Sequence, residues 1–165
     1  MRCLAVMLCT FLAAPIAHAA VFDVDRLDDA VDAAPGDGVC LAEGGGCTLR
    51  AALQESNALA GVDQVLLGSG VHVLSIAGAD EDMAASGDLD VSDALELGGA
   101  GPEATVIDAA ALDRVLDLQD SVSPVAMSLR ALTLRNGLLT SFSPTRGGGA
   151  GLRVGVQVQL ELDQV

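Results

Sequence analysis

Residues 125–129 have the sequence VAMSL, and residues 158–162 repeat the same alternation of apolar and polar side chains as VQLEL, 33 positions later. Alternation with a period of two predicts β-strands that bury one face. A repeat of this length, with loops of unequal size between its copies, is typical of folds that stack similar layers. The two stretches are therefore predicted to occupy equivalent places in successive layers.

Short Val and Leu runs divided by Gly, Asp and Pro occupy the chain from residue 63 onward. A similarity between residues 94–99 (ALELGG) and 131–137 (ALTLRNG) suggests a second pair of equivalent layers. Such strands suit a sandwich, a barrel or a solenoid, and the internal repeats favour an all-β solenoid. We expect strands at 64–67, 71–76, 89–91, 95–97, 105–107, 115–118, 127–134, 152–158 and 160–162.

One amphipathic helix is predicted from Thr48 to residue 60. Thr48 is a suitable N-cap, and Gly61 is suited to end the helix. The residues predicted to form its apolar face are Leu49, Ala52, Leu53 and Leu59. Since repeat folds need their exposed ends covered, we expect this helix to cap the stack of strands.

The composition indicates one folded domain without nucleic-acid partners. The chain has 165 residues, 51% hydrophobic content and no Trp or Tyr, so its core must consist mainly of small aliphatic side chains. Its net charge is −15, because eight basic residues, all of them Arg, are opposed by 23 carboxylates. Such an acidic chain repels a polyanion, which excludes DNA and RNA as expected ligands.

The N-terminal residues predict a signal peptide over 1–19. Arg2 supplies a positive charge, residues 3–14 are apolar, and the small residues around Ala19 are typical of a cleavage site. We expect cleavage between Ala19 and Ala20, which leaves 7 Arg against 23 acids and a charge of −16. No later stretch is apolar enough to cross a membrane. The expected location is outside the cell or in the envelope or outer surface of a bacterium.

Cys40 and Cys47 are the only cysteines beyond the predicted signal peptide. In an oxidising compartment, two cysteines flanking a Gly-rich loop are expected to form a disulfide. A metal site is the alternative, but it would need two further ligands, and His72 is the only histidine left after cleavage.

Two segments resemble a known family. Residues 35–40 (PGDGVC) and 46–58 (GCTLRAALQESNA) are similar to the N-terminal Cys-Ser-Leu-Arg-Glu-Ala (CSLREA) domain of exported bacterial β-helix proteins. Residues 87–91, 99–101, 105–108, 113–116 and 132–137 are similar to the segments downstream of that motif in the family. Two departures from the motif are Thr48 in place of Ser and Ala51 in place of Glu, so the capping-box carboxylate is missing.

The resemblance implies a right-handed parallel β-helix of the pectin-lyase-like type, exported and often attached to the cell surface, without an assigned reaction. On this view residues 20–62 form an N-terminal cap with the disulfide loop and the helix. Residues 63–165 form the first coils and end within a coil. We therefore expect a truncated or split gene product whose open end can self-associate.

Few residues are candidates for chemistry. Asp88 and Asp90 alternate with Leu89 and Val91, so both carboxylates project from one face of a strand. They are either Ca²⁺ ligands or part of a solvated outer face, and we favour the latter. For a lyase, Arg130 and Arg135 are the candidate bases, although turn or edge positions explain them more simply. His72 is expected to point outward without a partner.

The sequence thus predicts a non-catalytic exported or cell-surface protein, adhesin-like or structural, with no catalytic residues, no cofactor and no metal. Its expected partner is a surface, a carbohydrate or a protein. The alternative is a polysaccharide lyase or hydrolase, or its remnant, that uses Ca²⁺.

Overall fold

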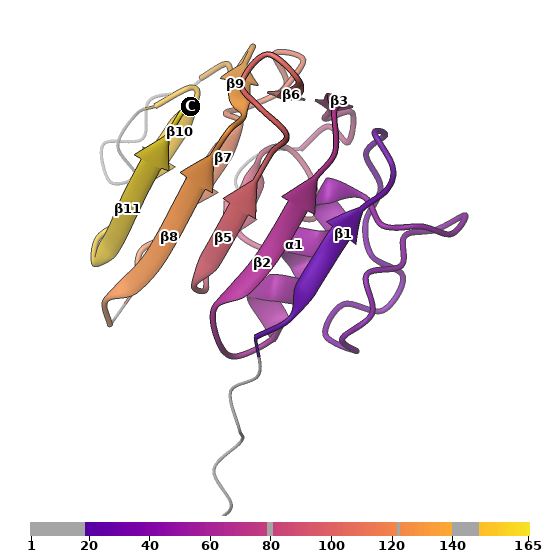
Figure 1. The fold of residues 1–165 in the computed structure, drawn as a ribbon, viewed down its shortest axis with the longest axis horizontal. Helices are drawn as coiled ribbons and strands as arrows, with labels where there is room; N and C mark the ends of the chain where they lie inside the picture. Colours follow the sequence, from indigo (N-terminus) through magenta and orange to yellow (C-terminus); the bar gives the residue numbers. More distant parts are fainter. Residues whose placement is uncertain (1–18, 79–80, 122, 140–148) are drawn as a thin grey trace, which may run out of the picture.

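The computed structural model describes residues 19–78, 81–121, 123–139 and 149–165, which form three parallel sheets and one helix (Figure 1). The largest sheet contains, in spatial order, β1 (Val21–Val24), β2 (Asp63–Leu67), β5 (Leu95–Gly98), β8 (Val125–Arg130) and β11 (Val158–Asp163). The second contains β3 (Gly70–Val73), β6 (Thr105–Asp108) and β9 (Thr133–Arg135). The third contains β4 (Leu89–Val91), β7 (Leu116–Leu118) and β10 (Leu152–Val154). The helix is α1 (Leu49–Ala58).

The chain visits the three sheets in turn. From β2 it passes through β3 to β4, and the same passage recurs from β5 and from β8. Strands from successive passages pair in parallel, so β11 and β1 form opposite edges of the largest sheet (Figure 1). One face of every sheet is lined by small aliphatic side chains that share a single core, among them Val65, Leu89, Leu97, Ile107, Leu116 and Leu129.

The repeat of 33 positions is confirmed as a strand register. Val158 pairs with Val125, and Leu162 pairs with Leu129, across the β8–β11 ladder. The other predicted similarity is wrong, because Leu95 in β5 pairs with Met127, whereas residues 133–135 form β9 beside β6 in a different sheet. Apolar alternation alone does not distinguish strands of different sheets, since every strand here buries one face of the same core.

Two of the stretches that were predicted as single strands each contain parts of two strands in the structure. The stretch predicted at 127–134 is broken at Ala131, whose φ is 53°, so that β8 ends and β9 begins in another sheet. The stretch predicted at 152–158 is likewise broken before β11, where Gln157 has a φ of 66°. A non-glycine residue in the left-handed region cannot continue a strand, and neither residue type signals such a bend in the sequence.

The predicted helix and its N-cap are confirmed, but the helix ends at Ala58 with Leu59 as its C-cap, two residues before Gly61. The Thr48 hydroxyl oxygen accepts a hydrogen bond from the Ala51 amide at 3.1 Å and donates one to the Ala30 carbonyl at 2.5 Å. However, the helix is buried on more than its apolar face. Eight of its ten residues are buried, and they include Arg50, Gln54 and Glu55.

The buried polar side chains of α1 bind loops from distant parts of the chain. The Glu55 carboxylate accepts the amides of Gly36 and Gly38 at 2.7 and 2.8 Å. The Gln54 side chain accepts the Asp32 amide at 2.8 Å and donates to the Ala84 carbonyl at 3.1 Å. The helix therefore organises both the loop before it and the segment that precedes β4.

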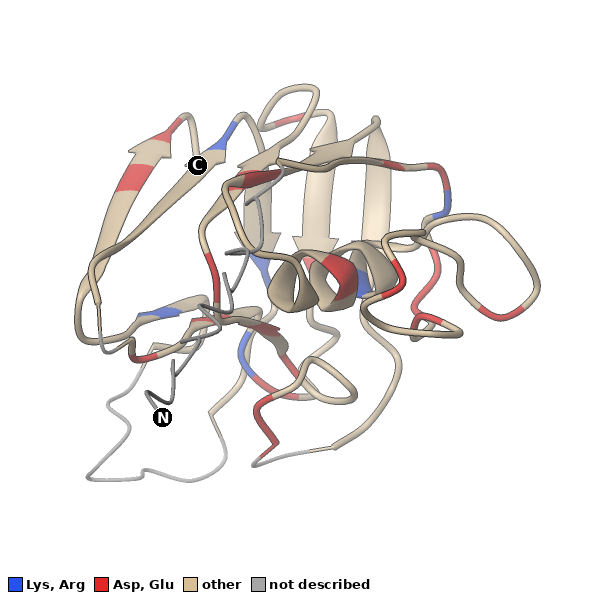
Figure 2. Cartoon of the chain, turned by 90° about the horizontal axis from the view of Figure 1, so that it is seen from below, with Lys and Arg blue, Asp and Glu red and all other residues tan. Residues whose placement is uncertain are grey.

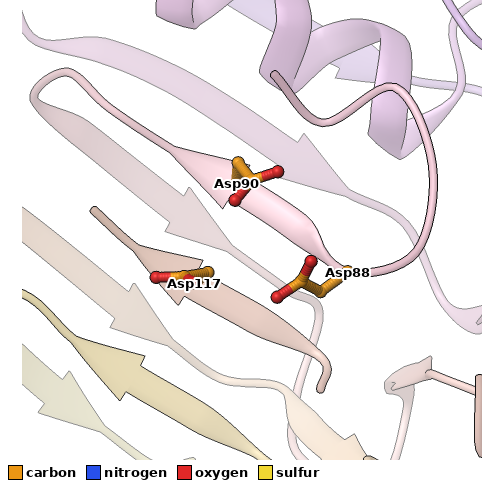
Figure 3. Close-up of side chains that lie close together, drawn as sticks. All are labelled: Asp88, Asp90 and Asp117. Carbon is orange, nitrogen blue, oxygen red and sulfur yellow. The ribbon is translucent and has the colours of Figure 1, made fainter. Parts of the chain in front are cut away.

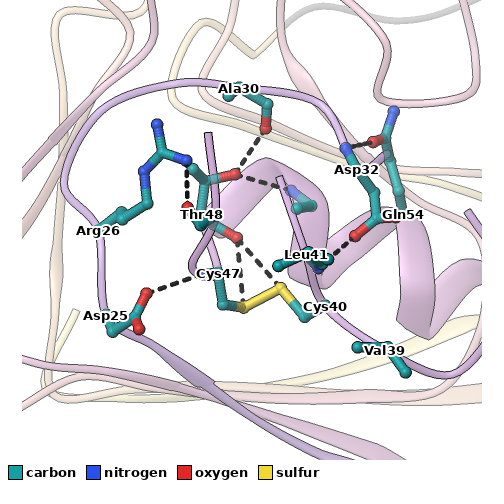
Figure 4. The surroundings of a disulfide bond; sticks show 12 residues. Asp25, Arg26, Ala30, Asp32, Val39, Cys40, Leu41, Cys47, Thr48 and Gln54 are labelled. Atoms are coloured by element: carbon teal, nitrogen blue, oxygen red, sulfur yellow. Dashed lines mark hydrogen bonds between the residues drawn. A yellow bond between two sulfur atoms is a disulfide. The ribbon is translucent and has the colours of Figure 1, made fainter. Parts of the chain in front are cut away.

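The predicted disulfide between Cys40 and Cys47 is confirmed (Figure 4). Hydrogen bonds hold the bridged loop at both ends. The Cys47 amide donates to the Asp25 carboxylate at 2.7 Å, and the Leu41 amide donates to the Asp32 carboxylate at 2.8 Å. The disulfide thus joins the loop to the residue immediately before the helix N-cap.

The predicted fold class, an all-β right-handed parallel β-helix with a helix that only caps its end, is wrong. The described residues form a small α/β domain of three mostly short-stranded parallel sheets and one helix. The physical reason is the burial of α1, which contacts β1, β2 and β4 and contributes Leu53 to the common core. The helix is an integral part of the packing, as its position behind β1 and β2 in Figure 1 illustrates.

Candidate functional site: a buried row of charged side chains

The third sheet carries charged side chains on the face opposite the core. Asp90 in β4 pairs in register with Asp117 in β7, and Asp117 pairs with Arg153 in β10. The apolar neighbours of Asp90 and Asp117 on their strands all lie in the core, and Leu152 beside Arg153 packs against it, as strand alternation requires. A row of two carboxylates and one guanidinium therefore crosses the sheet at right angles to its strands.

A second arginine joins this row from the turn before β7. The Arg114 Nε atom lies 2.6 Å from Asp88 Oδ2 and 3.5 Å from Asp117 Oδ2. On the other side of Asp117, the Arg153 Nε atom lies 2.5 Å from Oδ1. Figure 3 shows Asp88 directly before β4, Asp90 on β4 and Asp117 on the neighbouring strand β7. We call Asp88, Asp90, Asp117, Arg114 and Arg153 the charged row.

Asp90 is the member of the charged row whose carboxylate is bound by neutral donors. It accepts hydrogen bonds from Gln119 Nε2 and from the Ala84 amide, both at 3.0 Å. Burial raises the pKa of Asp90 to about 7, and the Ala84 amide only partly opposes that shift. Burial and the nearby Asp113 charge likewise raise the pKa of Asp88 to about 6, against the opposing effect of Arg114.

The expectation of a solvated outer face for Asp88 and Asp90 is wrong. Their exposed fractions are 5% and 1%. The predicted alternation itself is confirmed, since Leu89 and Val91 face the core. The polar face is buried because the chain around Ala84 and the side chain of Gln119 lie over it.

The charged row fits a Ca²⁺ site poorly. Oxygen atoms of Asp88, Asp90 and Asp117 lie within 4.8 Å of one another, which is close enough for a shared cation. Calcium requires six to eight oxygen ligands, however, and two guanidinium groups already bind Asp88 and Asp117. A cation entering here would meet the positive charge of Arg114, so the geometry describes an ion-pair network.

The pKa of Asp90 makes the stability of the fold depend on pH. The unfolded chain loses this proton at about pH 4, whereas the folded protein keeps it up to about pH 7. Between those values the folded protein binds more protons, so the free energy of unfolding falls as the pH rises. For Asp90 the loss is on the order of 2–4 kcal/mol.

We therefore expect the variant Asp90→Asn to lose most of this dependence, with the share due to Asp88 remaining. Urea unfolding at about pH 5 and pH 8 measures the difference for the parent and the variant. The matched control is Asp23→Asn, which removes an exposed carboxylate from β1. An unchanged pH slope in the Asp90 variant would show that this carboxyl group ionises normally.

His72 lies inside the fold, and the prediction that it points outward is wrong. Its exposed fraction is 3%, and it pairs in register with the core residue Ile107. Neither ring nitrogen makes a hydrogen bond of acceptable geometry within the described part of the chain. Burial lowers the pKa of His72 more than the nearby carbonyl groups of Gly68 and Arg26 raise it.

We expect His72 to weaken the fold in acid. Below about pH 6.5 the unfolded chain takes up a proton that the folded protein binds less readily, so the free energy of unfolding falls as the pH falls. The variant His72→Leu should lack this acid-dependent loss. It should also be more stable by about 1 kcal/mol at pH 7, since it removes unpaired polar atoms from the interior.

The variant His72→Asn provides the comparison, because it cannot titrate but still buries polar atoms. It should likewise lack the acid-dependent loss that His72 causes, but without the gain at pH 7. Chemical denaturation of both variants across about pH 5–7 tests the two effects separately. A leucine variant that is as acid-sensitive as the parent contradicts the prediction.

The two candidate lyase bases lie in different sheets. Arg130 ends β8, is half-exposed and lies 4.0 Å from Glu96. Arg135 ends β9, and its Nε atom lies 2.8 Å from Asp108 Oδ2. The structure therefore brings neither arginine to the charged row, and both lie at strand ends, in agreement with the simpler interpretation.

A groove of about 580 Å³ lies on the largest sheet, over β5, β8 and β11. Its outward-facing polar side chains include Glu96, Ser128 and Glu161, which pair in register across three strands. Gln159 and Arg130 flank this row. Acidic residues elsewhere are scattered over many loops, as Figure 2 shows.

Sequence reasoning missed three members of the charged row: Asp117, Arg114 and Arg153. A signal for two of them was present. Residues 89–91, 116–118 and 152–154 have the sequences LDV, LDL and LRV, a shared pattern of one charge between two apolar residues. Aligning these triplets places Asp117 and Arg153 in one row with Asp90. Arg114 lies outside the pattern, because it reaches the row from a turn.

No family model matches the chain, and comparisons with curated proteins and with solved structures likewise find no match. The resemblance to the Cys-Ser-Leu-Arg-Glu-Ala domain therefore stays a prediction. Nearly all of the predicted signal peptide lies outside the described residues, which begin at Ala19. Among the described residues, no helix has the length and apolar character that crossing a bilayer requires.

Proposed function

We propose that the chain is a non-catalytic exported or cell-surface protein, adhesin-like or structural, which binds a neutral, hydroxyl-rich glycan on the groove over β5, β8 and β11. The proposal rests on one observation. The charged side chains that could act in catalysis are paired with one another inside the fold, whereas polar side chains at the surface line a groove. Asp88, Asp117, Arg114 and Arg153 form ion pairs with one another.

The chemistry of the groove suits sugar hydroxyls. The carboxylates of Glu96 and Glu161 accept hydrogen bonds, whereas the Gln159 amide and the Ser128 hydroxyl can both donate and accept them. The small side chains of Ala126 and Ser128 leave room between the longer ones. With a net charge of −15, the chain repels acidic polysaccharides, which favours a neutral ligand.

The export of the chain is supported by two features. The first is the charged, apolar and small-residue pattern at its N-terminus. The second is the disulfide between Cys40 and Cys47, which persists in an oxidising compartment. Both agree with a protein that acts outside the cytosol.

A binding experiment with the exported, purified chain tests the proposal. Immobilised neutral and acidic polysaccharides are incubated with it, with Ca²⁺ or with a chelator, and both retention and soluble sugar products are measured. We expect retention on a neutral glycan, no effect of Ca²⁺ and no cleavage. Ca²⁺-dependent release of sugar products that is lost in Asp90→Asn would overturn the proposal in favour of a carbohydrate-active enzyme.

Two variants locate the binding surface. Ala126→Arg fills the groove from an exposed position on β8, so we expect it to lose at least tenfold in glycan affinity. Glu103→Gln changes an exposed carboxylate outside the groove and should bind as the parent does. Equal binding by both variants would exclude the groove as the site.

A further inference from the structure

The outer edge of β11 offers backbone groups that no described residue uses. Among the described residues, β11 pairs only with β8. The carbonyls of Gln157 and Asp163 accept hydrogen bonds from the Val125 and Ala131 amides, so odd-numbered residues of β11 turn toward β8. In a parallel ladder the alternate residues turn away. Val158, Leu160 and Leu162 therefore direct their N–H and C=O groups to the free edge.

Apolar side chains accompany this edge. Leu162 is 53% exposed, and Val158 and Leu160 are only half-buried, although all three belong to the face that packs on the core in other strands. An unpaired strand edge with exposed apolar residues is a template for pairing with another chain. The edge thus combines hydrogen-bond groups that no described residue uses with apolar surface that no described strand covers.

We propose that β11 pairs with β11 of a second copy of this chain, in an antiparallel arrangement centred on Leu160. In this register Leu160 lies opposite Leu160 of the second copy, and Val158 lies opposite Leu162. These are the residues whose backbone groups face outward, so each such pair exchanges two hydrogen bonds. The side chains of the core face also stay together, since paired residues lie on the same side of a sheet.

The charges of β11 favour this register over the one centred on Glu161. With Leu160 at the centre, Glu161 lies opposite Gln159, and Asp163 lies opposite Gln157, so each acid meets an amide. A shift that places Glu161 at the centre sets two glutamates against each other, which is destabilising. Each copy carries a net charge of −15, or −16 without the predicted signal peptide, so raising the salt concentration should strengthen the dimer by screening repulsion between the copies.

Sedimentation of the exported, purified chain without any glycan tests the proposal independently of the proposed function. We expect a monomer–dimer equilibrium that shifts toward dimer as salt is added. Leu162→Asp should weaken the dimer at least tenfold, because it buries a carboxylate against Val158 of the second copy. The matched control is Val21→Asp at the opposite edge of the same sheet, where Val21 is 56% exposed.

Cross-linking tests the register. Cys40 and Cys47 are joined to each other, so an added cysteine is the one free thiol of the chain without its predicted signal peptide. Mild oxidation should join two copies of Leu160→Cys, because paired residues lie about 5.5 Å apart. Two copies of Leu162→Cys are separated by four strand positions, about 13 Å, and should stay unlinked.

Three results would overturn the proposal. One is a monomer at all accessible concentrations and salt conditions. Another is a dimer that Val21→Asp breaks and Leu162→Asp does not, which would move the contact to the β1 edge. The third is efficient cross-linking of Leu162→Cys with none of Leu160→Cys, which would exclude the register.

Discussion

Replacing Arg50 with methionine is expected to lower the free energy of unfolding by about 3–5 kcal/mol, the usual cost of removing one partner of a buried ion pair. The side chain of Arg50 is 0% exposed and that of its partner Asp29 is 1% exposed. Without the guanidinium group, the Asp29 carboxylate stays buried with its charge uncompensated. A domain of ordinary stability would lose much of its margin.

Arg50 also holds the segment before β4 in place. Besides contacting Asp29 Oδ1 at 2.6 Å, its guanidinium donates hydrogen bonds to the carbonyls of Ala84, Gly87 and Asp88, at distances of 3.1, 2.9 and 3.1 Å. Lysine cannot reproduce this forked set of donors, so Arg50→Lys should also be destabilising. We expect its loss to be smaller than that of Arg50→Met, because a positive charge remains.

The matched control for Arg50→Met is Arg130→Met. Arg130 is 48% exposed at its side chain and lies 4.0 Å from a half-exposed Glu96. An ion pair of that kind contributes about 0–1 kcal/mol. Urea unfolding with the disulfide intact measures both variants, and equal midpoints for the two would contradict the structural role given to Arg50.

Breaking the disulfide between Cys40 and Cys47 is expected to cost about 2–3 kcal/mol, from the entropy that a short closed loop removes from the unfolded chain. The bridge spans a sequence separation of 7 and adjoins the N-cap of α1. The double variant Cys40→Ser/Cys47→Ser should unfold at a correspondingly lower urea concentration. Mass spectrometry of the parent should show the two cysteines linked.

Reduction provides the control for this variant. A reductant should lower the midpoint of the parent to about that of the serine variant and leave the variant unchanged. If the parent keeps its midpoint after complete reduction, hydrogen bonds such as that from the Cys47 amide to Asp25 hold the loop without the bridge.

The pH responses expected for Asp90 and His72 have opposite signs. Asp90 favours the fold at lower pH because the folded protein holds its proton. His72 favours the fold at higher pH because burial disfavours its charged form. Both responses arise because Asp90 and His72 are buried. The residue type alone does not predict this for Asp90, since Asp is rarely buried unless paired.

Local structure was largely predictable from local signals. Thr48 followed by apolar residues at helical spacing predicts α1, because an N-cap and a periodic apolar face act within one or two turns. Alternating Val and Leu predict most strands, and the register of β8 with β11 follows from one repeat. The disulfide follows from the only two cysteines beyond the predicted signal peptide.

The burial of polar side chains was not predictable in this way. The apolar face of α1 indicated which side would pack, but its polar side chains Arg50, Gln54 and Glu55 are buried as well, under loops that begin at residue 29 and at residue 84. Whether a polar residue is buried depends on which distant segment lies over it. That information is not contained in the periodicity of the element itself.

The repeat and the alternation of residues 125–129 and 158–162 were thus sufficient to predict paired strands in successive layers. Only the tertiary structure decided that α1 packs into the core, that Asp88 and Asp90 are buried beside arginines, and that His72 points inward. The physical reason is that alternation and helical spacing are properties of neighbouring residues along the chain. Burial and ion pairing are set by contacts between segments that are far apart in sequence, such as the 36 positions between Asp117 and Arg153.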